Sequence, residues 1–234
     1  HRAPTAVLRF AMEEPRTLDP GLADDDISSF FISQIFEGLV RIGRDYNVIP
    51  AAAERWETNE DGTCYVFHLK EGALWNDDSY LTAVDFINAW RRNLRLKEET
   101  GAVNLLYAIK NARAFRENTL EDLNLLGIKA LDDLVLEVTL EEPTPYLPYL
   151  IAHPIFYPLP TWVIERYAEN WTLRDNITTN GPYEISDWIP GKRIILTENP
   201  LYKGEYVGNV RQVVISTHET IWPALEDYKA GELD

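Results

Sequence analysis

The sequence predicts an α/β fold of the mixed α+β kind, on three observations. Apolar residues recur at three- and four-residue spacing in segments 27–39 and 83–94, the periodicity of amphipathic helices. In segment 134–141 apolar residues alternate with other residues, the period-two pattern of a half-buried strand. Clusters of Gly, Pro, Asn and Asp separate such segments and indicate turns.

The N-terminal part predicts a strand followed by a helix. Residues 6–12 form a short, mostly apolar run, and a Pro-bearing turn at 14–20 ends it. The helix carries apolar residues at Ile27, Phe30, Phe31, Ile35 and Leu39. Three acidic residues at 24–26 precede it and can cap its free amides and complement its positive end.

The middle part predicts two short strands, around 54–56 and 65–69, joined by a turn at 59–62. Thr82 is expected to cap the next helix, with Asp85 three residues later as in a capping box. A second, looser helix is expected over 103–115. A hairpin from 125–130 into 134–140 follows, with its turn at Asp132 and Asp133.

The C-terminal part predicts a packed but irregular segment at 143–160, where prolines interrupt regular structure and aromatic residues are interleaved. Strands are expected at 183–185, 193–196 and 213–215, the first two joined by a turn at 190–191. A last helix over 221–229 should end at Gly231 in the left-handed conformation. Leu233 and Asp234 resemble the start of another strand.

Charge and residue content exclude several functions. The 22 Lys and Arg against 38 Asp and Glu give a formal net charge of -16, which argues against nucleic acid and anionic lipid as partners. No apolar run has the length of a membrane-spanning helix, so no membrane insertion is expected of the chain as given. Cys64 is the only cysteine and the four histidines are scattered, so neither a catalytic residue nor a metal site is predicted. Phosphate-binding glycine loops are absent, and no cofactor is expected.

The order of several motifs resembles that of one family, the family 5 solute-binding proteins, which include the oligopeptide- and dipeptide-binding proteins of ABC importers. The motifs lie at residues 18–20, 35–40, 50–56, 67–77, 81–86, 180–183, 199–202 and 228–234. Asp78 and Leu81 depart from the pattern, since the family usually has Gly and Pro at these positions.

This resemblance implies a periplasmic-binding-protein-like type II fold. A discontinuous first domain would comprise residues 1–45 and 175–234, and an inserted second domain residues 46–174. The third domain, which closes over the ligand and carries the family's main anchors for peptide termini, would be absent from these 234 residues. The isolated chain is therefore expected to bind peptides weakly or not at all.

The resemblance also implies a ligand-binding loop. An ungapped match between residues 18–20 and 36–38 places Asp24, Asp25, Asp26 and Ile27 on it, where a carboxylate favours cationic ligand groups. An equally open alternative is that these aspartates only cap the following helix. Ala102 lies where the oligopeptide-binding branch tends to present an aromatic side chain to the ligand.

The function implied is that of an extracytoplasmic receptor, periplasmic or lipid-anchored at the cell surface. It would not be an enzyme, and would deliver peptides to the permease subunits of an ABC importer. The alternative is a peptide-sensing or adhesion module of the same fold, coupled to a signalling partner. Nickel complexes, haem and sugar oligomers, bound by relatives, also stay open as ligands.

Overall fold

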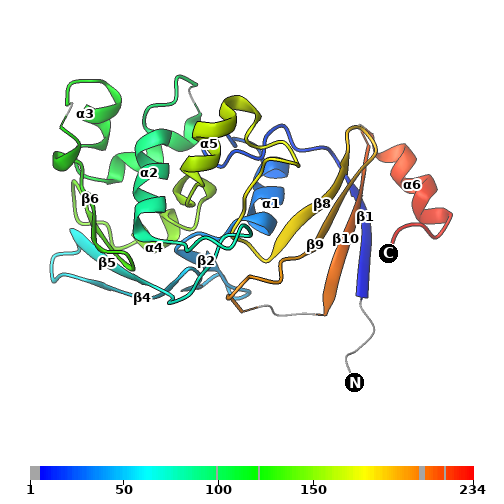
Figure 1. Ribbon diagram of the computed structural model, residues 1–234, viewed down its shortest axis with the longest axis horizontal. Coiled ribbons are helices and arrows are strands. Elements are labelled where there is room, and N and C mark those ends of the chain that lie inside the picture. Colours follow the sequence, from blue (N-terminus) through cyan, green and yellow to red (C-terminus); the bar gives the residue numbers. More distant parts are fainter. Residues whose placement is uncertain (1–5, 99, 121, 206–208, 219) are drawn as a thin grey trace.

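The computed structural model describes residues 6–98, 100–120, 122–205, 209–218 and 220–234. These residues form ten strands and six α-helices, with four short 3₁₀ helices between them (Figure 1). The strands are β1 (Ala6–Met12), β2 (Val40–Ile42), β3 (Val48–Pro50), β4 (Ala53–Thr58), β5 (Cys64–Leu69), β6 (Ile128–Asp132), β7 (Val135–Thr139), β8 (Tyr183–Ile189), β9 (Arg193–Glu198) and β10 (Val210–Thr217). The helices are α1 (Asp26–Ile35), α2 (Ala83–Asn93), α3 (Ala112–Arg116), α4 (Leu147–Leu150), α5 (Thr161–Tyr167) and α6 (Ile221–Lys229), with η1 (Gly101–Ala108), η2 (Leu123–Leu125), η3 (Pro154–Phe156) and η4 (Ala168–Asn170).

The strands form two four-stranded sheets and one small hairpin. The terminal sheet has the order β1-β10-β9-β8, in which β1 runs parallel to β10 and the other pairs are antiparallel. The middle sheet, with the order β4-β5-β7-β6, is antiparallel throughout. Strands β2 and β3 pair only with each other. The terminal sheet thus joins the two ends of the sequence, whereas the middle sheet is built from the interior of the chain.

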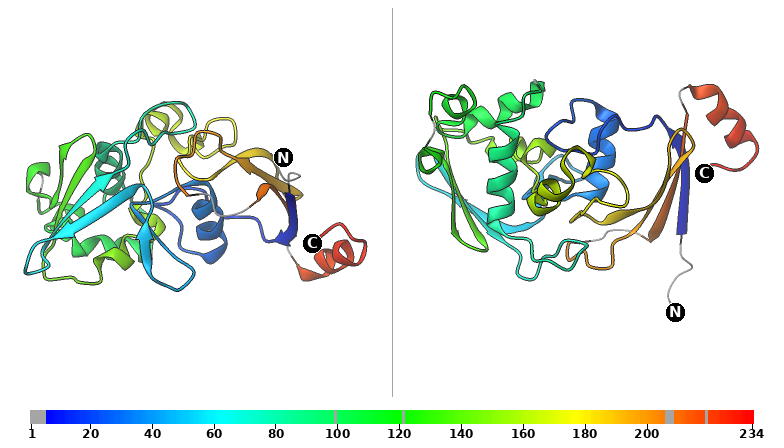
Figure 2. Two further views of the ribbon diagram at one scale, coloured as in Figure 1. Left: turned by 90° about the horizontal axis from the view of Figure 1, so that it is seen from below. Right: turned by 45° about the horizontal axis from the view of Figure 1, so that its top comes forward.

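Helices α1 and α5 lie between the two sheets, whereas α6 lies outside them, beyond β1 (Figures 1 and 2). Helix α2 packs on β6 of the middle sheet and α1 on β8 of the terminal sheet. The buried apolar side chains form one cluster that includes Phe67 of β5, Trp90 of α2, Phe31 of α1 and Ile215 of β10. A continuous core therefore connects both sheets.

The capping predictions are confirmed. Asp25 is the N-cap of α1, and its Oδ1 accepts a hydrogen bond from the amide of Ser28 at 2.8 Å. Thr82 and Asp85 form a capping box at α2, where Asp85 Oδ2 accepts from the amide of Thr82 at 2.8 Å. Burial raises the pKa of Asp85, against the hydrogen bonds from Thr82 and Trp75 that lower it.

The expected helix over 27–39 is wrong at its end, because α1 stops at Ile35. The amide of Gly181 donates to the carbonyl of Ile35 at 2.8 Å, and Phe36 is extended with φ −121°. The Asn180 side chain accepts from the amide of Glu37 at 3.1 Å and donates to its carbonyl at 2.9 Å. These long-range bonds satisfy the backbone that a longer helix would have paired internally.

The expected helix over 103–115 is also wrong. The segment divides into η1 and α3, because Ile109 forms a bridge to Leu140 and the amide of Lys110 donates to the carbonyl of Thr139 at 2.9 Å. Asn111 then takes a left-handed conformation with φ 64°. Pairing with the edge of another segment thus extends the backbone in the middle of an apolar periodic run.

The remaining elements are confirmed with small shifts of their ends, except the strand start expected at residues 233–234, which is wrong. Prolines at 143–160 leave only α4 and η3, and Ile151, Phe156 and Leu159 are buried there. Gly231 has φ 75° after α6. Residues 233–234 form no strand, although the amide of Asp234 donates to the carbonyl of Arg9 on β1 at 2.9 Å.

Candidate ligand-binding site

The predicted ligand loop lies at the N-terminal end of α1, on the upper side of the molecule in Figure 1. Asp24 and Asp26 are exposed, whereas Asp25 and Ile27 are half-buried. Ile27 packs against the core cluster. The loop therefore presents two carboxylates to solvent from a backbone that is fixed on both sides.

Asp25 has a mainly structural position in this loop. Partial burial works to raise the pKa of its carboxyl, but hydrogen bonds from Ser28 and the positive charge of Arg16 bring that pKa below the ordinary value. A lowered pKa means that the charged form is the one that the helix terminus stabilises. The capping alternative is thus realised at Asp25, while Asp24 and Asp26 make no cap contact in the structure as described.

A buried ion pair holds the loop on the middle part of the chain. The Asp19 carboxylate, 2% exposed, accepts from Arg92 of α2 at 2.9 and 2.5 Å. Its Oδ2 also accepts from the indole N–H of Trp171 at 3.3 Å, and its Oδ1 accepts from the amide of Gly21 at 2.9 Å. One carboxylate therefore links the N-terminal segment, α2 and the segment after α5.

Close packing reinforces this anchor. A Cβ atom at Gly21 would lie 2.2 Å from Oδ1 of Asn93, so only glycine fits against α2 here. Asn93 is itself fully buried and donates to the carbonyl of Ile155 at 2.9 Å. The loop position is set by α2 and the Pro-rich segment together.

Ala102 lies in η1, half-buried against the core cluster. It belongs to the segment that borders a hollow of about 340 Å³, lined by Thr100, Gly101, Val103, Asn104, Tyr107 and Arg116. The C-terminal end of α2, which precedes η1, lies on the same upper side as the loop before α1 (Figure 1). The five predicted residues thus come from two elements that are both tied to α2.

A second cavity, of about 560 Å³, lies between α1 and the terminal sheet, and none of the five predicted residues is among its described lining. Its wall is apolar at Phe10, Phe30 and Ile215, and polar at Glu37 and Tyr202. The Tyr202 hydroxyl donates to the Glu37 carboxylate. Burial raises the pKa of both groups, because the pair lies in a poorly solvated position.

Within the described ranges, no group of three or more His, Cys, Asp and Glu side chains could hold a metal ion. No helix among the same residues is long and apolar enough to cross a membrane. The His68 ring accepts from the Arg55 guanidinium at Nδ1 and donates to the Glu57 carboxylate at Nε2, and the His153 ring accepts from the amide of Ile155. These histidines have structural contacts.

Comparison with known sequences identifies the class of protein to which this fold belongs. Residues 47–234 match the family described as "Bacterial extracellular solute-binding proteins, family 5 Middle". The chain belongs to this family of extracellular solute-binding proteins. Among its curated relatives, the probable deoxycholate-binding periplasmic protein YgiS of Escherichia coli is 34% identical over 99% of this chain and 44% of its own length. The periplasmic oligopeptide-binding protein OppA of the same species is 34% identical over 94% of this chain and 41% of its own length.

Solved structures share the fold. The substrate-binding domain of an oligopeptide ABC transporter from Bacillus anthracis has a TM-score of 0.93 at 31% identity, over 99% of this chain and 45% of that one. OppA of Haemophilus influenzae in complex with the peptide RPPGFSPFR has a TM-score of 0.90 at 28% identity, over all of this chain and 46% of that one. The expected periplasmic-binding-protein fold is confirmed. The chain spans less than half the length of these relatives.

The sequence alone missed the residues that hold the loop. Asp19 was part of a recognised motif, but its partners Arg92 and Trp171 are 73 and 152 positions away. A buried aspartate requires a partner, but the burial of Asp19 is visible only in the structure. Which arginine supplies it depends on how α2 packs.

Proposed function

We propose that the protein is the substrate-binding receptor of an ABC importer, located outside the cytoplasm, and that it delivers peptides to the permease subunits. Family membership supports the receptor role. Peptide as the ligand is supported by relatives described as oligopeptide- or dipeptide-binding. A periplasmic location is supported by the same descriptions. The observation that carries the proposal is the loop at α1, which the Asp19–Arg92 ion pair anchors to α2 and which exposes the carboxylates of Asp24 and Asp26.

The domain division belongs to this proposal. Residues 1–45 and 175–234 would form the first domain and residues 46–174 the inserted second one. The sheet topology supports it, because β1 pairs with β10 across the whole length of the chain while β4 to β7 pair only among themselves. In such an arrangement the Asp19–Arg92 ion pair joins the two domains. This ion pair would hold the two domains together as one surface on the ligand side.

Asp24 and Asp26 are proposed to meet positive groups of the ligand, and Ile27 and Ala102 to border it. Replacing Asp24 with Asn should weaken binding of a lysine-containing peptide by up to about fivefold, the range of one exposed charge pair. Binding of the matched alanine peptide should stay the same. Asp45→Asn, an exposed turn residue between β2 and β3, is the control and should change neither. Equal losses for both peptides at Asp24→Asn would contradict a ligand contact through charge.

The direct test is native mass spectrometry of the full-length protein, purified without denaturation. A retained peptide that is released on unfolding is the expected result. A bound bile acid would instead place the protein with its deoxycholate-binding relative. A metal complex, haem or a sugar oligomer in the bound fraction would equally refute peptide as the ligand class.

A further inference from the structure

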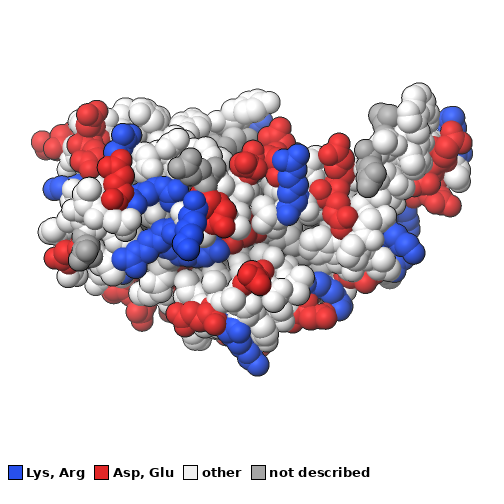
Figure 3. Space-filling model, turned by 90° about the horizontal axis from the view of Figure 1, so that it is seen from above, with Lys and Arg blue, Asp and Glu red and all other residues white. Residues whose placement is uncertain are grey.

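Positive charge is concentrated in one short part of this acidic chain. Seven of its 22 Lys and Arg residues fall between positions 91 and 116, where only Glu98 and Glu99 are acidic. These seven are Arg91, Arg92, Arg95, Lys97, Lys110, Arg113 and Arg116. Figure 3 shows Lys and Arg side chains gathered on the part of the upper face that lies over α2. In a protein with a net charge of -16, such a concentration creates a local field of opposite sign.

Four of these cations form what we call the basic rim: Arg95, Lys97, Arg113 and Arg116. Arg95, Lys97 and Arg113 are exposed, and Arg116 is half-buried. As far as the described residues show, no Asp or Glu side chain makes an ion pair with any of the four. Arg92, by contrast, is neutralised by Asp19. The rim therefore keeps its charge available to a negative group from outside.

The guanidinium groups of the rim are held in place before any ligand arrives. Arg95 lies over the ring of Phe115, 4.6 Å from its centroid, and Arg113 lies over the ring of Tyr107 at 4.9 Å. A guanidinium stacked by its face keeps its N–H edges free for a carboxylate, and loses little further entropy on binding. Arg116 donates to the carbonyls of Leu94 and Leu96 at the end of α2, which fixes its position.

The basic rim is continuous with the hollow beside Ala102. Arg116 and Tyr107 both line that hollow, and Tyr107 carries Arg113 on its ring. The opposite charge, from Asp24 and Asp26, lies at the other element of the proposed site. The acidic loop at α1 and the basic rim beside η1 thus give the two elements of the proposed site opposite charge.

We propose that the basic rim binds a carboxylate group of the ligand and makes the receptor selective for ligands with negative charge at the η1 end. This inference rests on the proposed receptor function. The carboxylate can come from an acidic side chain or from the C-terminus of a peptide. Both use the same bidentate chemistry with arginine, and they can be separated by amidation.

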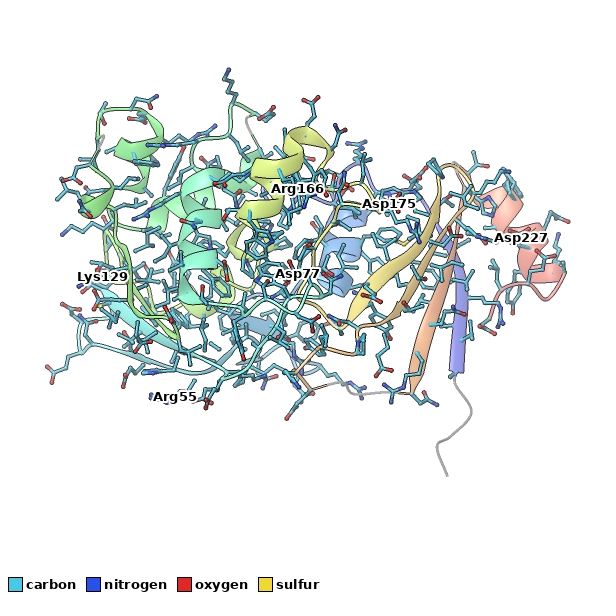
Figure 4. The ribbon with its side chains drawn as sticks, in the orientation of Figure 1. Arg55, Asp77, Lys129, Arg166, Asp175 and Asp227 are labelled. Carbon is cyan, nitrogen blue, oxygen red and sulfur yellow. The ribbon has the colours of Figure 1, made fainter. Side chains whose placement is uncertain are left out.

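The test measures calorimetric affinities of the full-length protein for Ala-Glu-Ala, Ala-Gln-Ala and the C-terminal amide of Ala-Gln-Ala. The variants are Arg113→Gln and Lys97→Gln. Arg55→Gln is the matched control, because Arg55 is an exposed arginine on the lower side of the molecule, away from the rim (Figure 4). Arg113→Gln should reduce the preference for the peptide whose carboxylate contacts the rim by about three- to fivefold, as for one charge pair, and leave the affinity for the carboxylate-free amide unchanged. The preference should shrink in ~0.5 M salt because exposed charges are screened.

The outcomes distinguish the two proposals. If Arg113→Gln loses affinity for Ala-Glu-Ala alone, the rim binds the acidic side chain. If it loses affinity for Ala-Gln-Ala but not for the amide of that peptide, the rim binds the C-terminal carboxylate. If all three peptides bind equally well, or if Arg113→Gln and Arg55→Gln have equal effects, the carboxylate site is overturned and the receptor function stands. If none of the peptides binds, the peptide-receptor proposal fails, and the inference fails with it.

Discussion

The Asp19–Arg92 ion pair gives the sharpest prediction for the architecture. Replacing Asp19 with Ala leaves the guanidinium of Arg92 without a counter-charge and removes the acceptor for Trp171 and Gly21. Removing one partner of a buried ion pair costs about 3–5 kcal/mol. The Arg92 side chain keeps 22% exposure, so we expect about 3 kcal/mol, at the lower end of that range.

The measurement is equilibrium urea unfolding at pH 7, followed by far-ultraviolet circular dichroism. Asp187→Ala is the matched control, because Asp187 also accepts two hydrogen bonds from one arginine, Arg193, but on an exposed surface. That change should cost about 0–1 kcal/mol. The double variant Asp19→Ala with Arg92→Met should recover about 2 kcal/mol, because the unpaired charge is then gone. Equal costs for Asp19→Ala and Asp187→Ala, or simple additivity in the double variant, would refute the role of the pair as a buried anchor.

Three further predictions concern stability. Burial raises the pKa of Glu37 above its ordinary 4.5, so the folded protein gains stability as the pH falls towards that value. Glu37→Gln should remove this gain. The melting temperature of the wild type should therefore rise relative to that of the variant from pH 8 to pH 5, and a constant difference would contradict this. Gly181→Ala places Cβ 2.4 Å from the backbone of Ile35 and should lower the free energy of unfolding in urea by about 2–3 kcal/mol. Gly101→Ala, with open space around it, should change it by no more than about 0.5 kcal/mol. Similar values for the two variants would contradict the close packing at Gly181. Asp78 has φ 68°, so Asp78→Gly should stabilise the turn by about 0.5–1 kcal/mol in the same assay, and a loss of stability would show that the aspartate has a favourable role there.

Local sequence signals predicted most elements of this fold. The period-two run became β7, and the cap at Thr82 began α2, because both depend on residues close in sequence. The two wrong helices failed for one physical reason. Backbone groups of residues 36–39 and 109–111 form hydrogen bonds with other segments of the chain, and such bonds override local helix periodicity.

The candidate site divides in the same way. Residues 24–27 and Ala102 were placed by motif order, and their role in binding is still a prediction. The structure added Arg92, Trp171 and the basic rim, whose members come together only when α3 packs beside the end of α2. Charge density between 91 and 116 was visible in the sequence, but free and neutralised cations could not be told apart there.

The sequence by itself determined the family, the mixed fold and the capped start of α1, since motif order and local hydrogen bonding are encoded in neighbouring residues. Only the tertiary structure decided where α1 ends, which arginine neutralises Asp19, and which arginines stay available to a ligand. Each of these depends on contacts between residues tens of positions apart. Whether a charge is buried and paired, or exposed and free, is a property of packing.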